Sequence, residues 1–231
     1  DDGKQWQRIN INLPNVPVVD IEVKDADLVI ATTGRGFWVL DDVTPIRDHY
    51  LPVVQKPAHL YPVPDHTRFG YSWWMDYAPG GDPVGMKKYI VQNQRPCLIY
   101  YELGVVNVEK KRKFVDAGDP KPLGVMMYFR LSEGANDVSL TIVDEQGNDI
   151  ITYGKDAMTL KYAAEGDYSY EAGLNRFVWD MRYPIITAVP GRPATKIRPF
   201  ARPGKYQARL TVDGVSQTRD FELFINPNEP Y

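Results

Sequence analysis

The stretch DLVIATTGRGFWVLDD, residues 27–42, decides how the first part of the chain folds. Two runs in it, residues 28–32 and 37–40, are rich in the β-branched and aromatic residues that suit β-strands. The four residues between these runs include Gly34 and Gly36, which permit the positive φ that a tight turn requires. The stretch therefore predicts an antiparallel hairpin.

Residues 1–60, which surround this hairpin, show no helical pattern. VPVVDIEV, residues 16–23, alternates loosely between apolar and polar side chains and suits a further strand. We therefore expect one small sheet of three or four short antiparallel strands. A sheet of this size cannot bury both of its faces alone, so it should pack against neighbouring structure.

The composition favours β structure for the whole chain. Its 231 residues include 15 Tyr, 5 Trp, 19 Pro and 18 Gly, and aromatic runs broken by proline and glycine are typical of all-β proteins. The net charge of −3 argues against nucleic acid as the main partner. The one cysteine, Cys97, allows no internal disulfide and is most simply a small buried hydrophobe. No apolar run approaches the roughly 20 residues that a membrane-spanning helix needs.

The middle of the chain, residues 45–96, is expected to be an extended linker with an aromatic loop. Its first part, TPIRDHYLPVVQKPAHLYPVP, is rich in proline; residues 44–50 have room for one short helix, and the rest is expected to be extended. Residues 65–89 show no sustained period and predict a long loop.

Strand patterns return from residue 97. Apolar runs separated by turn residues are CLIYYEL (97–103), VMMYFRL (125–131), VSLTIVDEQGNDIITY (138–153), RFVWDMRY (176–183) and KYQARLTVDGVSQTRDFELFI (205–225). Gly147 and Gly214 lie in two of the turns, at positions where a positive φ suits a hairpin. About seven strands separated by such turn residues predict a two-sheet sandwich over residues 97–231.

The chain begins DDGKQW, and these six residues resemble the Asp-box of BNR (bacterial-neuraminidase-type) repeats, whose signature is S-x-D-x-G-x-T-W. On that match Asp1 is the aspartate of the box, Gly3 its glycine and Trp6 its tryptophan. Gln5 departs from the usual Thr or Ser, and the leading Ser would precede the chain. The resemblance implies a hairpin turn on the rim of a β-propeller, with the aspartate bound to turn amides and the tryptophan packed between sheets. Such a box is a folding device and not a catalytic site.

Longer stretches resemble the sortilin-like BNR propeller proteins that are often labelled glycosyl hydrolases. GRGFWVLDD (34–42) is similar to the end of their last blade, and GLNRFVWDMRYP (173–184) and PGKYQARLTVDG (203–214) resemble their C-terminal module. That module is Ig-like and similar to the one in flagellar hook-capping proteins. The resemblance implies an all-β chain with a terminal propeller blade at residues 1–44, an extended linker at 45–96 and an Ig-like sandwich at 97–231. It also implies the tail of a longer protein that is periplasmic, attached to the cell envelope or secreted.

Candidate catalytic carboxylates have a simpler structural interpretation. A sialidase-type site combines residues from several blades, and a single blade cannot assemble it. Asp41 and Asp42 are adjacent, so on a strand they point to opposite faces and cannot easily act on one bond. A role in ending the strand is favoured for both.

The candidate metal ligands do not match the spacing of known metal-binding motifs. His49, His59 and His66 have spacings that match no ordered zinc-ligand pattern, and we expect them to be solvated or locally hydrogen-bonded. DEQGND, residues 144–149, lacks the order of a calcium loop and favours a hairpin turn. We therefore expect no metal and no cofactor.

An aromatic segment, FGYSWWMDY (residues 69–77), is the most suggestive contact candidate. Its candidate partner or ligand contacts are Phe69, Tyr71, Trp73, Trp74, Met75 and Tyr77. Such side chains are costly to leave in water. They suit a seam between the blade and the sandwich, an anchor for a protein partner or a stacking platform for sugar rings.

Two basic segments are further candidates. EKKRKF, residues 109–114, contains Lys110, Lys111, Arg112 and Lys113. These cations suit an acidic partner or an anionic membrane surface, although a solvated hairpin loop is favoured over both. RPATKIRPFARPGKY, residues 192–206, suits either an acidic groove on a partner or a simple crossover between strands.

These observations predict a non-catalytic structural or protein-interaction module that serves as an accessory subunit of a larger assembly, with a membrane-associated assembly as one option. Its partners would be another protein or further propeller blades, with no nucleic acid and no membrane span. The alternative is a C-terminal accessory part of a BNR-type glycosidase whose active site lies in other blades. In that case the module would contact carbohydrate through Trp73 and Trp74.

Overall fold

The computed structural model describes residues 3–4, 6, 8–9, 13–48, 51–68, 100–106, 109–114, 121, 124–154, 170–184 and 198–226. The described chain is mostly β-strand with two single-turn helices, which confirms the all-β prediction. It divides into two compact units. The first comprises Asp1–Val43, Lys87–Glu102 and Arg112–Lys121, and the second comprises Thr44–Met86, Leu103–Lys111 and Pro122–Tyr231.

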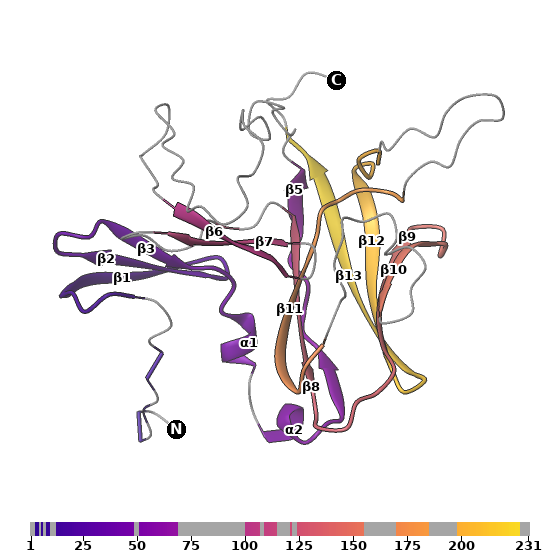
Figure 1. Ribbon diagram of the computed structural model, residues 1–231, viewed down its shortest axis with the longest axis horizontal. Coiled ribbons are helices and arrows are strands. Elements are labelled where there is room, and N and C mark those ends of the chain that lie inside the picture. The colour runs from indigo at the N-terminus through magenta and orange to yellow at the C-terminus, as the bar shows by residue number, and fades with distance from the viewer. Residues whose placement is uncertain are drawn as a thin grey trace. The chain divides into compact units, whose positions relative to one another are not determined.

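The first unit contains an antiparallel three-stranded sheet, which we call the docking sheet. Its strands β1 (Val18–Lys24), β2 (Asp27–Thr32) and β3 (Phe37–Leu40) follow one another in sheet order (Figure 1). The hairpin predicted at residues 27–42 is confirmed by the register, in which Leu28 faces Leu40. Gly34 and Gly36 have φ of 87° and 68°, which side chains other than glycine rarely adopt.

The register assigns side chains to the two faces of the docking sheet, because residues paired across strands share a face. One face carries Ile21, Val23, Leu28, Ile30, Trp38 and Leu40. The other face carries Asp20, Glu22, Lys24, Asp27, Val29, Ala31, Phe37 and Val39. The first face is therefore apolar, and the second combines apolar side chains with charged ones.

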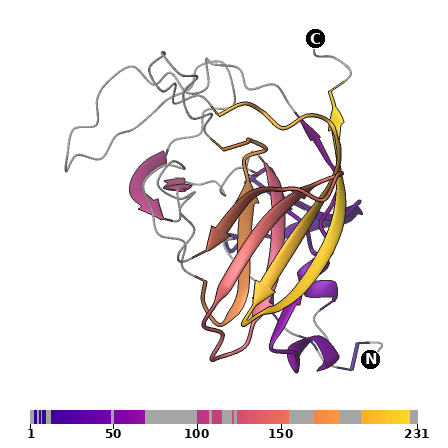
Figure 2. The same ribbon diagram turned by 90° about the vertical axis from the view of Figure 1, so that its right-hand side faces the viewer.

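The second unit is built on two sheets. The larger has the order β10-β9-β12-β13-β5 and the smaller the order β11-β8-β4 (Figures 1 and 2). The strand bounds are β4 Ala58–Leu60, β5 His66–Arg68, β8 Val125–Leu131, β9 Val138–Asp144, β10 Asp149–Gly154, β11 Gly173–Trp179, β12 Gly204–Val212 and β13 Val215–Ile225. Two short helices, α1 (Thr44–Arg47) and α2 (Leu51–Val54), precede these strands. Strands β6 (Tyr100–Val106) and β7 (Glu109–Phe114) form a separate two-stranded sheet.

A single core joins the two sheets of the second unit. Trp179 on β11 is fully buried, and its ring lies 5.5 Å from that of Tyr206 on β12 and 6.0 Å from that of Phe221 on β13. On the smaller sheet Phe129 is also fully buried, as is Leu140 on the larger one. Burial of each such side chain contributes about 1.5–3 kcal/mol, so the second unit has its own source of stability.

Segments expected to be linker belong to these sheets. β4 pairs with β8, and β5 pairs in parallel with β13, so residues 58–60 and 66–68 are strands within the second unit. The side-chain amide of Gln217 on β13 receives a hydrogen bond from the Leu60 amide and donates one to the Ala58 carbonyl. Residues 51–54 are helical although an extended chain was expected there. Three-residue strands carry no readable period, so long-range pairing determines them.

Candidate functional site

The docking sheet exposes apolar side chains to an unusual degree. Phe37 is 78% exposed, and Val19, Ile21, Val23 and Val39 are each more than half exposed. Every residue of β1 is exposed. Isolated apolar side chains on a surface are ordinary, but a contiguous apolar patch marks an interaction site. The docking sheet is therefore a candidate contact surface.

A polar cluster holds the end of this sheet. Asp27 accepts hydrogen bonds from the Asp42 amide at 2.9 Å and from the ammonium of Lys121 at 2.8 Å, and Lys121 also lies 3.6 Å from Asp41. Burial by itself would raise the pKa of Asp27, but the hydrogen bonds from Lys121 and the Asp42 amide outweigh it, so this pKa is lowered. Burial by itself would lower the pKa of Lys121, but the hydrogen bond to Asp27 outweighs it, so this pKa is raised. Asp41 and Asp42 thus stand where β3 ends.

The segment that resembles an Asp-box forms a local turn. The indole nitrogen of Trp6 donates a 2.8 Å hydrogen bond to the carbonyl of Gly3, whose φ is 79°. Trp6 is 88% exposed, so the packing between sheets that the resemblance implies is not seen for this side chain among the described residues. Asp1 lies outside the described residues.

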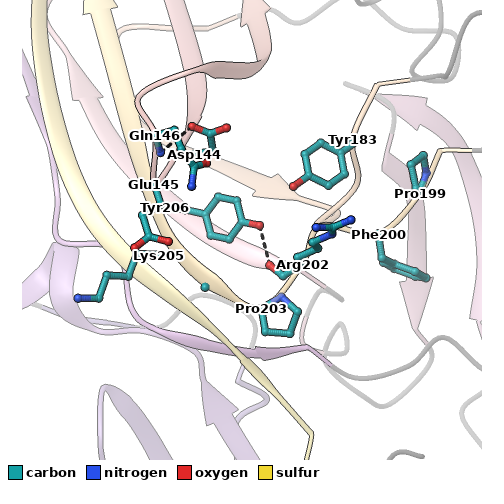
Figure 3. A pocket seen from close by; sticks show the side chains of 11 residues that line it. Asp144, Glu145, Gln146, Tyr183, Pro199, Phe200, Arg202, Pro203, Lys205 and Tyr206 are labelled. Carbon is teal, nitrogen blue, oxygen red and sulfur yellow. Dashed lines mark hydrogen bonds between the residues drawn. The ribbon is translucent and has the colours of Figure 1, made fainter. Parts of the chain in front are cut away.

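The second unit contains a pocket of about 510 Å³, shown in Figure 3. Its walls are the β9–β10 turn at Asp144, Glu145 and Gln146, the side chain of Tyr183, and two short segments at residues 199–200 and 202–206. In Figure 3 the rings of Tyr183 and Tyr206 project toward the same space. The pocket thus lies where β9 ends and β12 begins, next to the segment that follows β11.

The turn that forms one wall is fixed by Asp144. One of its carboxylate oxygens accepts hydrogen bonds from the amides of Gln146 at 3.0 Å and Asn148 at 2.8 Å. The side-chain amide of Asn148 also donates to this carboxylate. These bonds, those from Asn148 first, lower the pKa of Asp144. The predicted hairpin turn at residues 144–149 is confirmed, and Gly147 has the expected positive φ of 84°.

Tyr206 forms the floor of the pocket. Its hydroxyl donates a 2.6 Å hydrogen bond to the carbonyl of Arg202, and its ring is buried against Trp179 and Phe221. Burial and the neighbouring Tyr183 raise the pKa of Tyr206 well above its ordinary value. The hydroxyl therefore stays protonated at neutral pH and serves as a donor.

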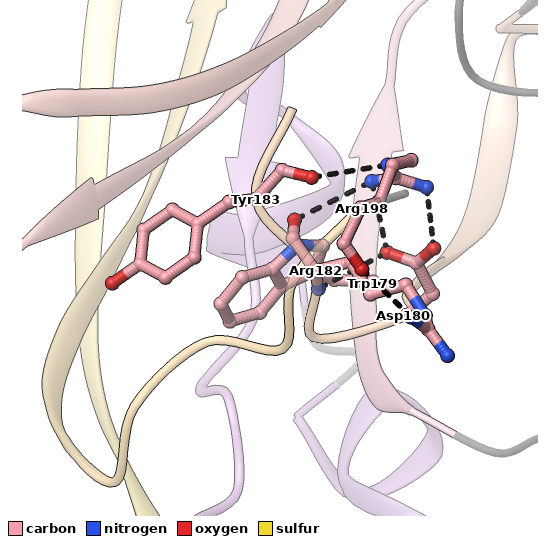
Figure 4. A network of polar contacts seen from close by, with 5 residues as sticks. All are labelled: Trp179, Asp180, Arg182, Tyr183 and Arg198. Atoms are coloured by element: carbon pink, nitrogen blue, oxygen red, sulfur yellow. Dashed lines mark hydrogen bonds and ion pairs between the residues drawn. The ribbon is translucent and has the colours of Figure 1, made fainter. Parts of the chain in front are cut away.

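Two arginines brace the remaining wall (Figure 4). The guanidinium of Arg198 binds both carboxylate oxygens of Asp180, at 2.5 and 3.2 Å, and donates to the carbonyls of Tyr183 and Arg182. Arg182 in turn donates to the carbonyl of Arg198, and its guanidinium lies 3.8 Å from the centre of the Phe200 ring. This reciprocal arrangement holds the two backbone segments side by side and so sets the position of Tyr183 relative to residues 199–206.

His59 lies away from the pocket, on β4. A solvated or locally hydrogen-bonded ring was expected, but His59 is buried, and its ring packs edge-on against Tyr61 with centroids 4.8 Å apart. Neither Nδ1 of His59 nor the hydroxyl of Tyr61 has a hydrogen-bond partner among the described residues. Burial first, and then the nearby cations of Lys56 and Arg219, lower the pKa of His59.

Several sequence-based candidates lie outside the described residues. These are Phe69, Tyr71, Trp73, Trp74, Met75 and Tyr77, together with His49 and Cys97. Lys110, Lys111, Arg112 and Lys113 lie on strand β7, whereas a loop was favoured for them, and their side chains are not described. His66 is on β5 and half-buried. Within the described ranges no three His, Cys, Asp or Glu side chains gather as metal ligands would, and no described helix has the length and hydropathy to cross a membrane.

The pocket was not identified from the sequence. Tyr183 and residues 199–206 lie in stretches singled out as similar to an Ig-like module or as a basic crossover, but their lining role depends on long-range pairing. The isolated bridge between Arg182 and Phe200 supplies that pairing. Comparison of the chain with family models, with curated proteins and with solved structures finds no match in any of the three.

Proposed function

We propose that the chain is a non-catalytic structural and protein-interaction module that joins a larger assembly through its docking sheet. The observation that carries this proposal is the exposure of apolar side chains on both faces of that sheet. A face of this kind is strongly favoured to be buried, at roughly 25 cal/mol for each Å² of apolar surface. Three short strands offer no layer of their own to cover it.

The nature of the partner follows from the two faces. Strands with apolar residues on both faces are typical of sheets covered on both sides. We therefore propose a partner that supplies apolar surface to each face, as neighbouring blades of a BNR-type propeller would. The Asp-box-like turn and the GRGFW hairpin support this assignment of the sheet as a terminal blade.

Charge adds a further condition on the partner. Asp20, Glu22 and Lys24 lie on the exposed strand β1 and share a face with Phe37 and Val39. A partner surface that covers this face would place basic groups opposite the two carboxylates and an acidic or polar group opposite Lys24, because charges left unpaired at an interface reduce affinity. The opposite face has no charged side chain among its paired residues, so a partner that covers it needs to supply only apolar side chains.

The second unit is proposed to be an Ig-like sandwich that stabilises the module. Ig-like domains commonly have a tyrosine near the start of a strand whose hydroxyl bonds to backbone a few residues upstream. The bond from Tyr206 to the carbonyl of Arg202 is of this kind, and the buried Trp179 beside it suits the same architecture. Export to the periplasm, the envelope or the medium is proposed on the resemblance of the sequence motifs alone.

Site-specific photo-crosslinking in cells that make the protein tests the docking proposal. A photoreactive phenylalanine at position 37 should form one adduct of defined mass. Introducing Ile21→Lys and Val39→Lys alongside it should abolish that adduct. The matched control is position 215, where Val215 is also a highly exposed apolar residue but lies on the β12–β13 turn of the second unit. Equal adducts from both positions, or none from position 37, would overturn the proposal.

A further inference from the structure

We propose that the pocket bounded by the β9–β10 turn, Tyr183 and residues 199–206 binds a neutral, polyhydroxylated ring, the pyranose of a sugar. This inference does not depend on the docking sheet, since every residue that lines the pocket belongs to the second unit. It also differs from the sequence-based expectation of carbohydrate contact, which placed that contact at Trp73 and Trp74.

The size and lining of the pocket make it a candidate ligand site. Its volume of about 510 Å³ falls within the range of roughly 300–1,000 Å³ typical of small-molecule sites. Most of the lining side chains are polar or charged, and they come from three separated parts of the chain. A purely apolar ligand would remove these groups from water without replacing their hydrogen bonds, which is unfavourable.

The charges in the pocket cancel. Asp144 and Glu145 stand on the turn, and Arg202 and Lys205 stand on the opposite segment. A strongly anionic ligand would meet the two carboxylates, and a cationic one would meet the two basic groups, so each would face like charge. A neutral ligand with both donors and acceptors can use all four groups.

The groups that would contact the ligand are not all occupied. The Asp144 carboxylate is already used by the turn, but the side chains of Glu145, Arg202 and Lys205 are exposed and make no ion pair among the described residues. Arg202 and Lys205 can donate to hydroxyl oxygens, and Glu145 can accept from hydroxyl protons, in charge-assisted hydrogen bonds.

The ring of Tyr183 suits the apolar face of a sugar, because it is only half-buried. The ring of Tyr206 is buried against Trp179 and Phe221, so it supports the pocket from the core. A pyranose has one face of C–H groups that packs against an aromatic ring while its hydroxyls reach the polar rim. The bond from Arg198 to the carbonyl of Tyr183 fixes the backbone there, which reduces the entropic cost of binding.

An NMR titration of the full chain with methyl β-D-glucoside, methyl β-D-galactoside and N-acetyl-D-glucosamine tests the proposal. Saturable amide shifts are expected at Gln146, Tyr183 and Lys205 with at least one of these sugars. Arg202→Ala and Glu145→Ala change exposed side chains that the fold does not need, and each should weaken that binding by about tenfold. Lys56→Ala, an exposed change elsewhere in the second unit, should leave the affinity unchanged.

Three results would overturn the proposal. These are the absence of saturable shifts with all three sugars, shifts centred outside the pocket, and affinities unaffected by both pocket variants. Inorganic phosphate and L-arginine serve as charged comparison probes, and tighter binding of either one would show that the pocket selects charge instead.

Discussion

The hydroxyl of Tyr206 donates a 2.6 Å hydrogen bond to the backbone carbonyl of Arg202, four residues earlier in the chain. The bond ties the start of β12 to the segment that enters it from Phe200. Because the ring beneath is packed against Trp179 and Phe221, the hydroxyl is held in place by the core. One contact therefore links the core of the second unit to the wall of the pocket.

Tyr206→Phe should lower the free energy of unfolding by about 1–2 kcal/mol, because it removes this bond and leaves the carbonyl without its donor while the ring remains. Urea unfolding followed by tryptophan fluorescence measures the change. Gln207→Leu on the same strand removes only an exposed bond to Asp220 and should cost less than about 0.5 kcal/mol. Equal effects from the two variants would contradict the role assigned to Tyr206.

Arg198→Lys should destabilise the second unit by about 1–3 kcal/mol even though it keeps the charge. Lysine cannot reproduce the planar fork that serves Asp180 and two backbone carbonyls together. Asp180→Ala should cost less than about 1 kcal/mol, because Asp180 is partly exposed and Arg198 keeps its carbonyl partners. A larger loss for Asp180→Ala, measured by urea unfolding, would mean that the ion pair and not the backbone bonds holds this wall.

Gly124→Ala and Gly204→Ala form a matched pair. The two glycines have nearly equal φ of 152° and 149°, so an alanine would adopt a similarly unfavourable φ at both. A Cβ at Gly124 would lie 2.3 Å from the carbonyl oxygen of Trp179, whereas one at Gly204 meets nothing within 4 Å. Gly124→Ala should therefore be the more destabilising by at least about 2 kcal/mol in thermal unfolding. Similar losses would show that strain, not the close approach of Gly124 to β11, sets the cost.

The parts of the fold that the sequence predicts are those specified by local signals. Gly34, Gly147 and Gly214 lie at turns whose backbone needs a positive φ, and each has one. The runs that became β8 and β9 are rich in apolar, aromatic and β-branched residues, so their strand character could be read directly. Local chemistry was also enough to predict that the first sheet would be too small to cover itself.

The parts that were missed depend on contacts between distant segments. β4 is three residues long, and only its pairing with β8 makes it a strand and buries His59. The basic run of β7 was taken for a loop because charge pattern alone does not distinguish a strand from a turn. The pocket could not be predicted from the sequence, because Tyr183 and Arg202 come together only through the bridge between Arg182 and Phe200.

The burial of His59 predicts a pH-dependent stability. Its pKa in the folded chain is lowered from the ordinary value of 6.5, so below that pH the unfolded chain takes up a proton that the folded chain does not. Stability should therefore fall as the pH drops below about 6.5, and level off below the folded pKa. His59→Leu should remove this part of the pH dependence in urea titrations between about pH 7.5 and pH 5. An unchanged slope in that variant would assign the dependence to other groups.

Polar substitution on the docking sheet should change surface behaviour without changing the stability of the second unit. Phe37→Glu with Val39→Lys replaces two exposed apolar side chains of β3. The variant should bind less of a hydrophobic dye such as ANS and remain monodisperse at higher concentration, because the apolar patch is interrupted. The unfolding free energy of the second unit should move by less than about 0.5 kcal/mol. If the unfolding free energy of that unit instead fell strongly, the apolar side chains of β3 would be part of the chain's own core. The sheet could then not be a surface kept for a partner.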